Sequence, residues 1–412
     1  MRPFRSLLQS IASLSVPRLL RPSDEGCEVK ACTALFLLAA SCAFATGQTN
    51  EHHSFQPGEI WTDNNHLHIN AHGGGVLYHQ GKYYWYGEHK VAGRAGNSAQ
   101  VGVHCYSSID LYNWTDEGIA LKVVENDPAS PIAKGCTLER PKVIYNTKTR
   151  KFVMWFHLEL RGKGYDAALS GVAVSDNAVG PFQFLRAERP DKGAWPVNVL
   201  PEHKTRKFNA NNATFNGGGA SEHPDVINFL GRDYEGGQMA RDMNLFVDDD
   251  GKAYHIFSSE ENSTIHISEL SNDYLSHVGR YVRAFPGRYM EGAALCKANG
   301  TYYFVASSCT GWTPNAARSA SAPSIFGPWT ELGNPCVGAG SDRTFESQST
   351  YILPVAGRTN AFIFMANRWK PENPIDGRYV WLPIRFKDGL MVLHWSDSWM
   401  LDDFDRMKSN NE

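Results

Sequence analysis

Residues 299–307 read NGTYYFVAS, a tight turn followed by a strand rich in aromatic side chains. Both central residues of a type I′ hairpin turn need a positive φ, which Asn-Gly tolerates, so the stretch predicts an antiparallel hairpin. A turn followed by an aromatic-rich run recurs in four further segments, with about 50 to 100 residues between successive copies: GKYYWYGE (81–88), KFVMWFHLE (151–159), DGKAYHIFSSE (250–260) and NAFIFMANRW (360–369).

Five similar segments spread along one chain are typical of the blades of a β-propeller, in which each blade is a small antiparallel sheet. No amphipathic helical pattern persists beyond a couple of turns after residue 60, and Gly, Pro, Asn and Asp separate the short apolar runs. A β-sandwich would not need the same segment five times. The sequence therefore predicts an all-β chain whose residues 61–405 form a five-bladed β-propeller.

The composition excludes several classes of protein. The chain has 412 residues, of which 12% are aromatic and 20% charged, with 37 glycines and a formal net charge of -3. This aromatic content excludes intrinsic disorder, and the low charge with many glycines excludes a coiled coil. The net charge offers no basic surface for nucleic acid. Abundant Trp and Tyr suit sugar-stacking platforms and a β-rich core equally well, so the choice rests on motifs.

Residues 1–45 are predicted to be an N-terminal extension with a secretory signal. The run ACTALFLLAASCAFA at 31–45 is too short to span a bilayer and ends in an Ala-Phe-Ala cleavage signal. A short linker (46–60) follows, and residues 406–412 form a tail. No later stretch is apolar enough to cross a membrane. We therefore expect a mature chain that is secreted or periplasmic and not membrane-bound.

Neither the cysteines nor the histidines predict a metal site. The cysteines after the signal contain no C-x-x-C pair, which excludes zinc ribbons, and their odd number leaves at least one unpaired. His66 and His68 would share one face of a strand, as zinc ligands can, but the segment around His72 has no carboxylate at matching parity. A structural or sugar-binding role is favoured for His72, and we expect no metal and no cofactor.

One glutamate has the surroundings of a catalytic acid. Hydrolysis of a glycosidic bond needs one group to protonate the leaving oxygen and another to activate water. The acid needs a raised pKa, which burial among apolar groups provides. Glu291 lies in YMEGAAL (289–295), with hardly another charge nearby. A glutamate on an edge strand is the alternative, and the pattern favours the catalytic role.

Three further carboxylates are candidate site residues, but their sequence contexts are less specific than that of Glu291. Glu139 precedes Arg140 and Lys142, either of which could pair with it, so a structural ion pair is as good an explanation as a role in a site. Asp242 opens the strand before the acidic turn 248–251, which resembles a plain β-turn more than a calcium loop. Glu88 ends an aromatic strand, where a carboxylate can bind sugar hydroxyls beside a stacking platform.

The region 186–241 has few strand patterns, so we interpret it as a long inserted loop. Long ordered loops on a rigid scaffold often lie at the active site. Trp312, Trp369 and Trp381 can each serve as a stacking platform for sugar or as part of the core.

The motifs, taken in order, resemble those of a known family: AHGGGVL, YYWYGE, LERPKVIYN, RDMNLFVDDDGKAY, EGAALCKANGTYYFVASSCTGW, SQSTYILP and NRW…RYVWLP. The chain resembles glycoside hydrolase family 43, and within it the branch of exo-β-1,3-galactanases. The resemblance runs from about Trp61 to Phe404. It implies a five-bladed propeller with the site at the central funnel, and an inverting mechanism without cofactor.

The resemblance also implies a role for each candidate. Glu291 matches the general acid, and Asp242 matches the aspartate that orients the acid and tunes its pKa. Glu139 and Glu88 match carboxylates that hold the sugar. The segment around His72 stands where the family usually has a catalytic aspartate, so that base is absent.

The exo-β-1,3-galactanase branch also lacks this aspartate and is thought to use a glutamine in place of the base. Gln348 matches that glutamine here. An amide orients water through its oxygen but is a poor proton acceptor outside its imidic form. Glu346 would share a face of a strand with Gln348, so we hypothesise that Glu346 assists Gln348 or supplies the base. Gly292-Ala293 after the acid departs from the common Ala-Pro.

The sequence thus predicts an exported hydrolase that releases galactose from an oligo- or polysaccharide such as β-1,3-galactan or arabinogalactan. An α-L-arabinofuranosidase or β-xylosidase is the alternative within the family. A carbohydrate-binding propeller that has lost catalysis is the alternative from another class. Retention of Glu291, Asp242 and Glu139 argues against the latter, because a binding module needs no acid among apolar groups.

Overall fold

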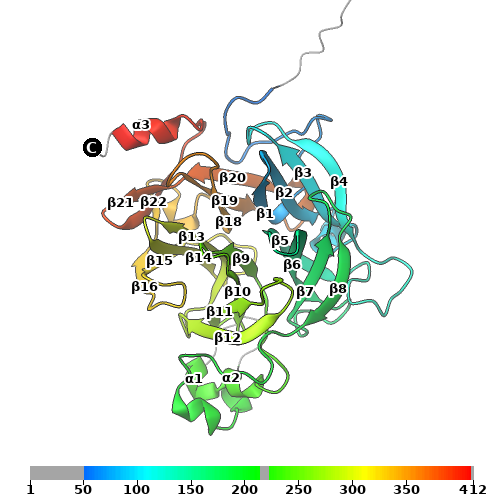
Figure 1. The fold of residues 1–412 in the computed structure, drawn as a ribbon, viewed down its shortest axis with the longest axis vertical. Coiled ribbons are helices and arrows are strands. Elements are labelled where there is room, and N and C mark those ends of the chain that lie inside the picture. The colour runs from blue at the N-terminus through cyan, green and yellow to red at the C-terminus, as the bar shows by residue number, and fades with distance from the viewer. Residues whose placement is uncertain (1–50, 214–221, 410–412) are drawn as a thin grey trace, which may run out of the picture. The chain divides into compact units, whose positions relative to one another are not determined.

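The computed structural model describes residues 51–213 and 222–409, and within these ranges strands form most of the regular structure (Figure 1). Four sheets have four antiparallel strands each, in chain order. They are β1 (His72–His79), β2 (Lys82–His89), β3 (Gly102–Ser108) and β4 (Thr115–Lys122); β5 (Thr137–Asn146), β6 (Lys151–Glu159), β7 (Leu169–Ser175) and β8 (Gln183–Glu188); β9 (Met243–Val247), β10 (Ala253–Ser259), β11 (Thr264–Leu270) and β12 (His277–Ala284); and β13 (Met290–Ala298), β14 (Thr301–Ser308), β15 (Arg318–Ala322) and β16 (Thr330–Gly333).

Two further sheets have three strands each. One contains β18 (Gln348–Pro354), β19 (Phe362–Arg368) and β20 (Arg378–Pro383), and the other contains β17 (Cys336–Val337), β22 (Leu390–His394) and β21 (Arg385–Lys387). The helices are short. They are the 3-10 turns η1 (Arg94–Asn97), η2 (Pro201–Lys204), η3 (Ala210–Asn212), η4 (Ser341–Arg343) and η5 (Pro374–Asp376), and the α-helices α1 (Pro224–Ile227), α2 (Phe229–Arg232) and α3 (Asp403–Ser409).

The prediction of an all-β propeller is confirmed, but the described strands form six sheets where five were predicted. The sixth sheet combines β17 with β21 and β22 from much later in the chain. These strands have two, three and five residues, and none carries the turn and aromatic run from which the blades were counted.

The sheets surround a common centre. The first strands of five of them, β1, β5, β9, β13 and β18, contact one another in that order, and β18 contacts β1 to close the ring. The sixth sheet lies outside this ring, where β22 contacts β20 (Figure 1). The N-terminal ends of the ring strands therefore meet at one mouth of the propeller.

Aromatic side chains fill the spaces between neighbouring sheets. Trp85, Trp114 and Trp381 are buried in one cluster together with Phe55 and Trp399. Phe55 pairs with Trp399 through two backbone hydrogen bonds of 2.9 and 3.1 Å, and their rings stack at 4.2 Å. The two ends of the described chain are thus joined, and Phe55 of the segment predicted as a linker belongs to the core.

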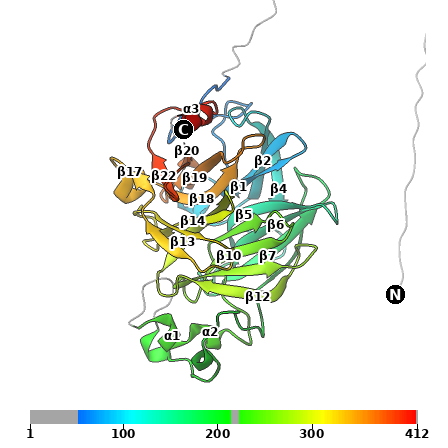
Figure 2. The same cartoon turned by 60° about the vertical axis from the view of Figure 1, so that its left-hand side comes forward.

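The irregular sequence of the region 186–241 suggested a long loop at the active site, but its described helices lie elsewhere. Its helices α1 and α2 lie beside β12, at the outer side of the third sheet, in both Figure 1 and Figure 2. Val197 N–H donates to the Tyr281 carbonyl at 2.8 Å, and Asn198 exchanges two hydrogen bonds with the Arg283 backbone. Among the described residues of this region, Arg241 at its end is the one that lines the cavity.

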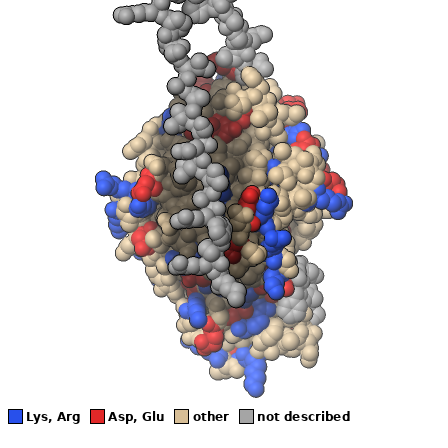
Figure 3. All heavy atoms as spheres, turned by 90° about the vertical axis from the view of Figure 1, so that its right-hand side faces the viewer, with Lys and Arg blue, Asp and Glu red and all other residues tan. Residues whose placement is uncertain are grey.

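The predicted signal (1–45) and the cysteines within it lie outside the described residues. No helix of the described part is long and apolar enough to cross a membrane. All the later cysteines are free thiols: Cys105, Cys136, Cys296, Cys309 and Cys336. On the face in Figure 3, outside the grey atoms, basic and acidic side chains lie beside one another between uncharged areas.

Candidate active site

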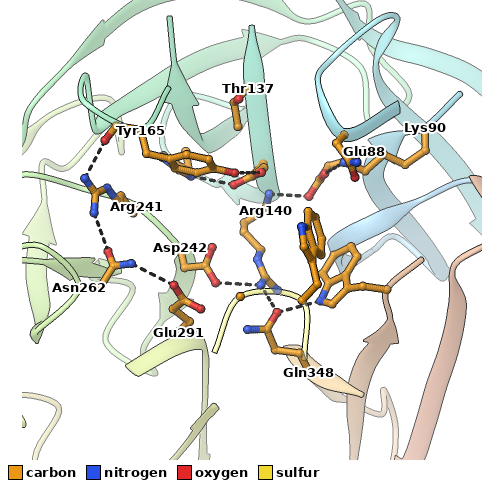
Figure 4. Close-up of a pocket in the computed structure, with 16 residues that line it drawn as sticks. Glu88, Lys90, Thr137, Arg140, Tyr165, Arg241, Asp242, Asn262, Glu291 and Gln348 are labelled. Carbon is orange, nitrogen blue, oxygen red and sulfur yellow. Dashed lines mark hydrogen bonds and ion pairs between the residues drawn. The ribbon is translucent and has the colours of Figure 1, made fainter. Parts of the chain in front are cut away.

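A cavity of about 420 Å³ opens at the mouth where the first strands of the sheets begin (Figure 4). This volume lies within the range of small-molecule sites. Except for His72, Glu346 and Trp381, every predicted site residue lines it: Glu88, Glu139, Asp242, Glu291, Trp312, Gln348 and Trp369. The ring of strands therefore brings together carboxylates that are far apart in the sequence.

Irregularities in the strands explain why these side chains reach the cavity. The pairing register shifts in β1 after His72, in β5 after Glu139 and in β13 after Glu291. Such bulges redirect side chains and are common next to active sites. In each, the following residue takes a left-handed conformation: Gly73 (φ 62°), Arg140 (φ 55°) and Gly292 (φ 63°).

Glycine is required at two of these positions. A Cβ on Gly73 would lie 2.2 Å from Glu88 Oε1, and one on Gly292 would lie 2.6 Å from the Ser349 carbonyl oxygen. The Gly292-Ala293 pair, a departure from the family pattern, thus fits the left-handed bulge. Arg140 is the exception, because it is not a glycine. The backbone strain of its left-handed conformation must be offset by the hydrogen bonds and ion pair that it makes.

The Glu291 carboxyl has the electrostatics of an acid catalyst. Burial raises its pKa, the nearby Asp242 carboxylate raises it further, and the value reaches about 7 although Arg140 and a hydrogen bond from Cys309 oppose the shift. Its Oε1 accepts a hydrogen bond of 3.0 Å from the Asn262 amide. At neutral pH a substantial fraction of Glu291 therefore carries a proton that it can donate.

Asp242 lies immediately before β9, between the acid and the neighbouring sheet. Its Oδ2 accepts 2.8 Å hydrogen bonds from the Gly292 backbone N–H and from the Arg140 guanidinium. Asp242 is thereby attached to the backbone directly after Glu291. This arrangement fixes the position of one carboxyl relative to the other.

Arg140 connects the two halves of the cavity, a role beyond the pairing with Glu139 that its place in the sequence indicates. Its guanidinium contacts Asp242 at 2.8 Å and Gln348 Oε1 at 2.7 Å (Figure 4). It also donates to the Ser349 carbonyl at 3.1 Å. Its backbone N–H donates to Glu88 at 3.1 Å. Only a guanidinium offers enough donors in one plane for this set.

The amide of Gln348 is held in one orientation. Its Oε1 accepts hydrogen bonds from Arg140 (2.7 Å) and from the Trp369 indole N–H (2.8 Å), and its Nε2 donates to Ser307 Oγ at 2.8 Å. Arg140 and Trp369 are donors only, so a flipped amide would place donor against donor. The nitrogen of Gln348 therefore faces away from Arg140.

Glu139 is held in its ionised form. Burial opposes ionisation, but a hydrogen bond and the charge of His157 lower the pKa of Glu139 to about 2. The His157 ring lies 3.1 Å from Glu139 and 3.0 Å from Glu159, and these two carboxylates raise the pKa of His157 to about 9 against the effect of its burial. Tyr165 O–H donates to Glu139 at 2.8 Å.

Glu88 and Lys90 form a buried ion pair of 2.5 Å at the wall opposite Glu291 (Figure 4). Below the cavity, the Lys142 ammonium donates to the carbonyl oxygens of Gly73 (3.0 Å) and Arg140 (3.3 Å). Burial and the charge of Arg140 lower the pKa of Lys142 well below its ordinary value. Lys142 thus satisfies two carbonyl groups of the bulges.

Two tryptophans line the entrance, and a third does not. Trp312 is 46% exposed and lies edge-on to Trp369, with ring centroids 6.0 Å apart. Arg140 lies 5.2 Å from the ring centroid of Trp369. Trp381 is buried in the core, so the platform role remains open only for Trp312 and Trp369.

His72 does not line the cavity, in contrast to its predicted contact with sugar. It is fully buried and stacks on Tyr379 with ring centroids 5.4 Å apart. Its burial, followed by the charge of Lys90, lowers its pKa well below the ordinary value. The bulge after His72 leaves the imidazole beneath the cavity wall.

Glu346 lies outside the cavity, which removes the basis for its predicted assistance to Gln348. β18 begins at Gln348, whereas Thr344, Phe345 and Glu346 all have a positive φ, so the strand parity from which the shared face was inferred does not apply. The Glu346 carboxylate is half exposed and pairs with Arg343.

Among the described residues, Glu139, His157 and Asp242 form the group whose donor atoms lie within 4.8 Å of one another, as metal ligands would. His157 is hydrogen-bonded on both ring nitrogens, and its raised pKa favours the protonated form, which cannot bind a metal. These residues therefore suit an ion-pair network better than a metal centre.

The central cavity of the propeller contains a carboxyl with a raised pKa, further carboxylates and an exposed tryptophan. These are the features expected of a glycosidase active site. The family model for glycosyl hydrolases family 43 matches residues 219–379. A solved family 43 β-1,3-galactosidase with galactodeoxynojirimycin is 50% identical, with a TM-score of 0.80, and the match covers 84% of this chain and 100% of that one. The chain belongs to glycoside hydrolase family 43.

Other relatives match more distantly. The exo-β-1,3-galactanase of Phanerochaete chrysosporium, solved with β-1,3-galactotriose, is 29% identical with a TM-score of 0.67, over 84% of this chain and 68% of that one. The exo-β-1,3-galactanase of Clostridium thermocellum is 33% identical with a TM-score of 0.67, over 84% and 66%. A β-D-galactofuranosidase of Aspergillus niger is 31% identical over 129 residues, 28% of this chain and 37% of that protein.

Proposed function

We propose that this glycosidase removes galactose from the end of β-1,3-galactan chains, with inversion at the anomeric carbon. The observation that carries the proposal is the Glu291 carboxyl, whose pKa of about 7 lets it carry a proton into a cavity lined by further carboxylates. The 50% identity to a β-1,3-galactosidase over that protein's whole length supports galactose as the sugar.

In the proposed reaction, Glu291 donates its proton to the glycosidic oxygen as the bond from that oxygen to C1 breaks. Water adds to C1 from the opposite face and releases a proton to the solvent of the open cavity, which completes hydrolysis with inversion. Asp242, attached to the Gly292 N–H, keeps the Glu291 carboxyl in place and raises its pKa.

Gln348 is the residue that positions the water. Its oxygen is occupied by Arg140 and Trp369 and one of its N–H groups by Ser307, so its second N–H is the group left to hold the oxygen of the water. Nitrogen accepts the proton of the water only in the imidic form. In that form the amide oxygen carries a hydrogen, which Arg140 and Trp369 oppose because both are donors only, so we assign Gln348 the orientation of the water and not the acceptance of its proton.

The test is the products formed from a set of substrates. Purified protein is incubated with β-1,3-galactan and with nitrophenyl β-galactopyranoside, β-galactofuranoside, α-L-arabinofuranoside and β-xyloside, with Glu291→Gln as control. Galactose as the single product, first appearing as the α-anomer in proton NMR, supports the proposal. Release of arabinose or xylose instead identifies one of the related activities, and binding without release identifies a carbohydrate-binding propeller.

We also propose that the chain is exported, because the run at 31–45 has the length and cleavage signal of a secretory segment. N-terminal sequencing of the protein from the culture medium or periplasm should begin just after Ala45. Full-length protein recovered with the cytoplasm would contradict export.

A further inference from the structure

The turn that joins β10 to β11 has an unusual backbone. Its residues Glu260, Glu261 and Asn262 all have a positive φ, of 52°, 56° and 65°. For residues other than glycine this conformation is costly, and it is rarely found in consecutive residues. The surrounding structure must therefore hold the turn in place.

Each of the two glutamates is anchored by buried ion pairs. Glu260 is 0% exposed, and its oxygens accept hydrogen bonds from Arg283 at 2.6 and 2.7 Å and contact His266 at 2.8 Å. Glu261 pairs with Arg232 at 3.0 Å and with Arg241 at 3.1 Å. Such pairs favour one geometry, because breaking them leaves a buried charge uncompensated.

The third residue of the turn reaches the acid. Asn262 is 7% exposed, its amide nitrogen donates to Glu291 Oε1 at 3.0 Å, and its amide oxygen contacts Arg241 at 3.4 Å (Figure 4). The contact to Arg241 requires the amide oxygen there, so the nitrogen points to Glu291.

We propose that Asn262 is a positioning residue for Glu291, and that the ion pairs of Glu260 and Glu261 hold the strained turn in the conformation that presents it. This inference rests on the proposed role of Glu291 as the acid. Because Asn262 donates to Oε1, that oxygen is the acceptor, and the transferable proton resides on Oε2. The hydrogen bond thus selects which oxygen delivers the proton to the leaving group.

The same anchors connect the acid to the inserted region at the outer side of the propeller. Arg283 also contacts Asp225 of α1 at 2.7 Å, and Arg232, which binds Glu261, is the last residue of α2. The inserted helices lie beside β12, yet two arginines link them to the turn that holds Asn262. This link gives the inserted helices α1 and α2 a role in positioning the acid from outside the cavity.

The experiment compares Asn262→Gly with Glu260→Gln. Glycine removes the amide and relieves the left-handed backbone, so loss of folding is not expected. Glu260→Gln keeps the shape of the anchor but removes its charge. The matched control is Glu269→Gln, which breaks an ion pair to Arg280 at the other end of the same β11–β12 hairpin.

We expect kcat on β-1,3-galactan to fall about tenfold in Asn262→Gly and in Glu260→Gln, with KM within about twofold of the parent. The alkaline limb of the kcat profile should move up by about one pH unit, because the lost donor stabilised the carboxylate form. The other groups that act on the Glu291 carboxyl, namely Asp242, Arg140, Glu139 and Cys309, are unchanged in these variants. Glu269→Gln should match the parent.

Unchanged kcat and pH profile in both variants would overturn the inference, even if they melt at lower temperature, because a merely structural turn would lower stability alone. If the parent releases no galactose, the proposed function fails by itself. In that case the effect of Asn262 on the pKa of Glu291 is measured without catalysis. Urea unfolding is compared with and without Glu291→Gln, both in the parent and in Asn262→Gly. For each, the midpoint is the pH around which Glu291→Gln begins to increase stability. A midpoint identical in the parent and Asn262→Gly would again overturn it.

Discussion

Replacing Glu291 by glutamine removes one titrating group and leaves the shape of the side chain almost unchanged. The folded pKa of this carboxyl is about 7, raised from 4.5 by burial and then by the charge of Asp242. Below about pH 4.5 the group is neutral in the folded and unfolded chains alike. Between pH 4.5 and 7 the unfolded chain loses its proton while the folded chain keeps it, so the parent protein loses stability as the pH rises.

The size of this effect follows from the shift. A difference of about 2.5 units at about 1.4 kcal/mol per unit gives an upper limit of about 3 kcal/mol. Because Glu291 lines an open cavity, solvent reduces this to about 1–2 kcal/mol. Glu291→Gln should therefore equal the parent in stability near pH 4 and exceed it by about 1–2 kcal/mol at pH 8 and above.

Urea unfolding of the two proteins at pH 4, 5, 6, 7 and 8, followed by tryptophan fluorescence, measures this difference. The control is Glu269→Gln, which removes a glutamate from an ion pair with the exposed Arg280 and should change stability little. A gap between parent and Glu291→Gln that is the same at pH 4 and pH 8 would refute the reasoning. Glu291 would then titrate alike in the folded and unfolded chains.

Further changes test other parts of the site with the galactose-release assay. Arg140→Lys should lower kcat/KM about 100-fold, since one ammonium cannot bind Asp242, Gln348 and the Ser349 carbonyl together; a loss below threefold contradicts this. Gln348→Ala should lower kcat at least 100-fold, whereas Glu346→Gln should stay within about twofold, because its carboxylate faces solvent and pairs with Arg343; equal losses would restore Glu346 as a base candidate. Trp312→Ala should raise KM about tenfold with little change in kcat if sugar stacks there, and an unchanged KM would exclude the platform. In the parent, kcat should decline above about pH 7 as Glu291 loses its proton, and a flat profile to pH 9 would contradict the assignment of the acid.

The repeated turn and aromatic run identify the propeller because each such segment contributes strands to a separate sheet. The sixth sheet escaped prediction, since it joins a two-residue strand at 336–337 to a hairpin at 385–394, and no local pattern encodes a pairing between distant segments. The region 186–241 has loop-like composition, but its contacts to β12 are set by single buried pairs such as Arg283 with Asp225.

Within the site, Glu291 was recognisable because its apolar neighbours reflect the burial that raises its pKa. The contacts of Arg140 could not be predicted from its place next to Glu139, because the bulge after Glu139 turns it toward Asp242 and Gln348. The shared face predicted for Glu346 and Gln348 is absent for a related reason, because the alternation of a strand does not extend to residues with a positive φ. Asn262 lies in a turn with no distinguishing motif, so only its contact with Glu291 reveals it.

Chromatographic detection of free monosaccharide from β-1,3-galactan, with the parent and Glu291→Gln side by side at pH 6, addresses the proposed function itself. Galactose should accumulate steadily with the parent and at least 1,000-fold more slowly with Glu291→Gln, because the amide has no proton of suitable acidity to give the leaving oxygen. Galactose release by Glu291→Gln at the parental rate would contradict the assignment of Glu291 as the acid, and no release by either protein would contradict the activity.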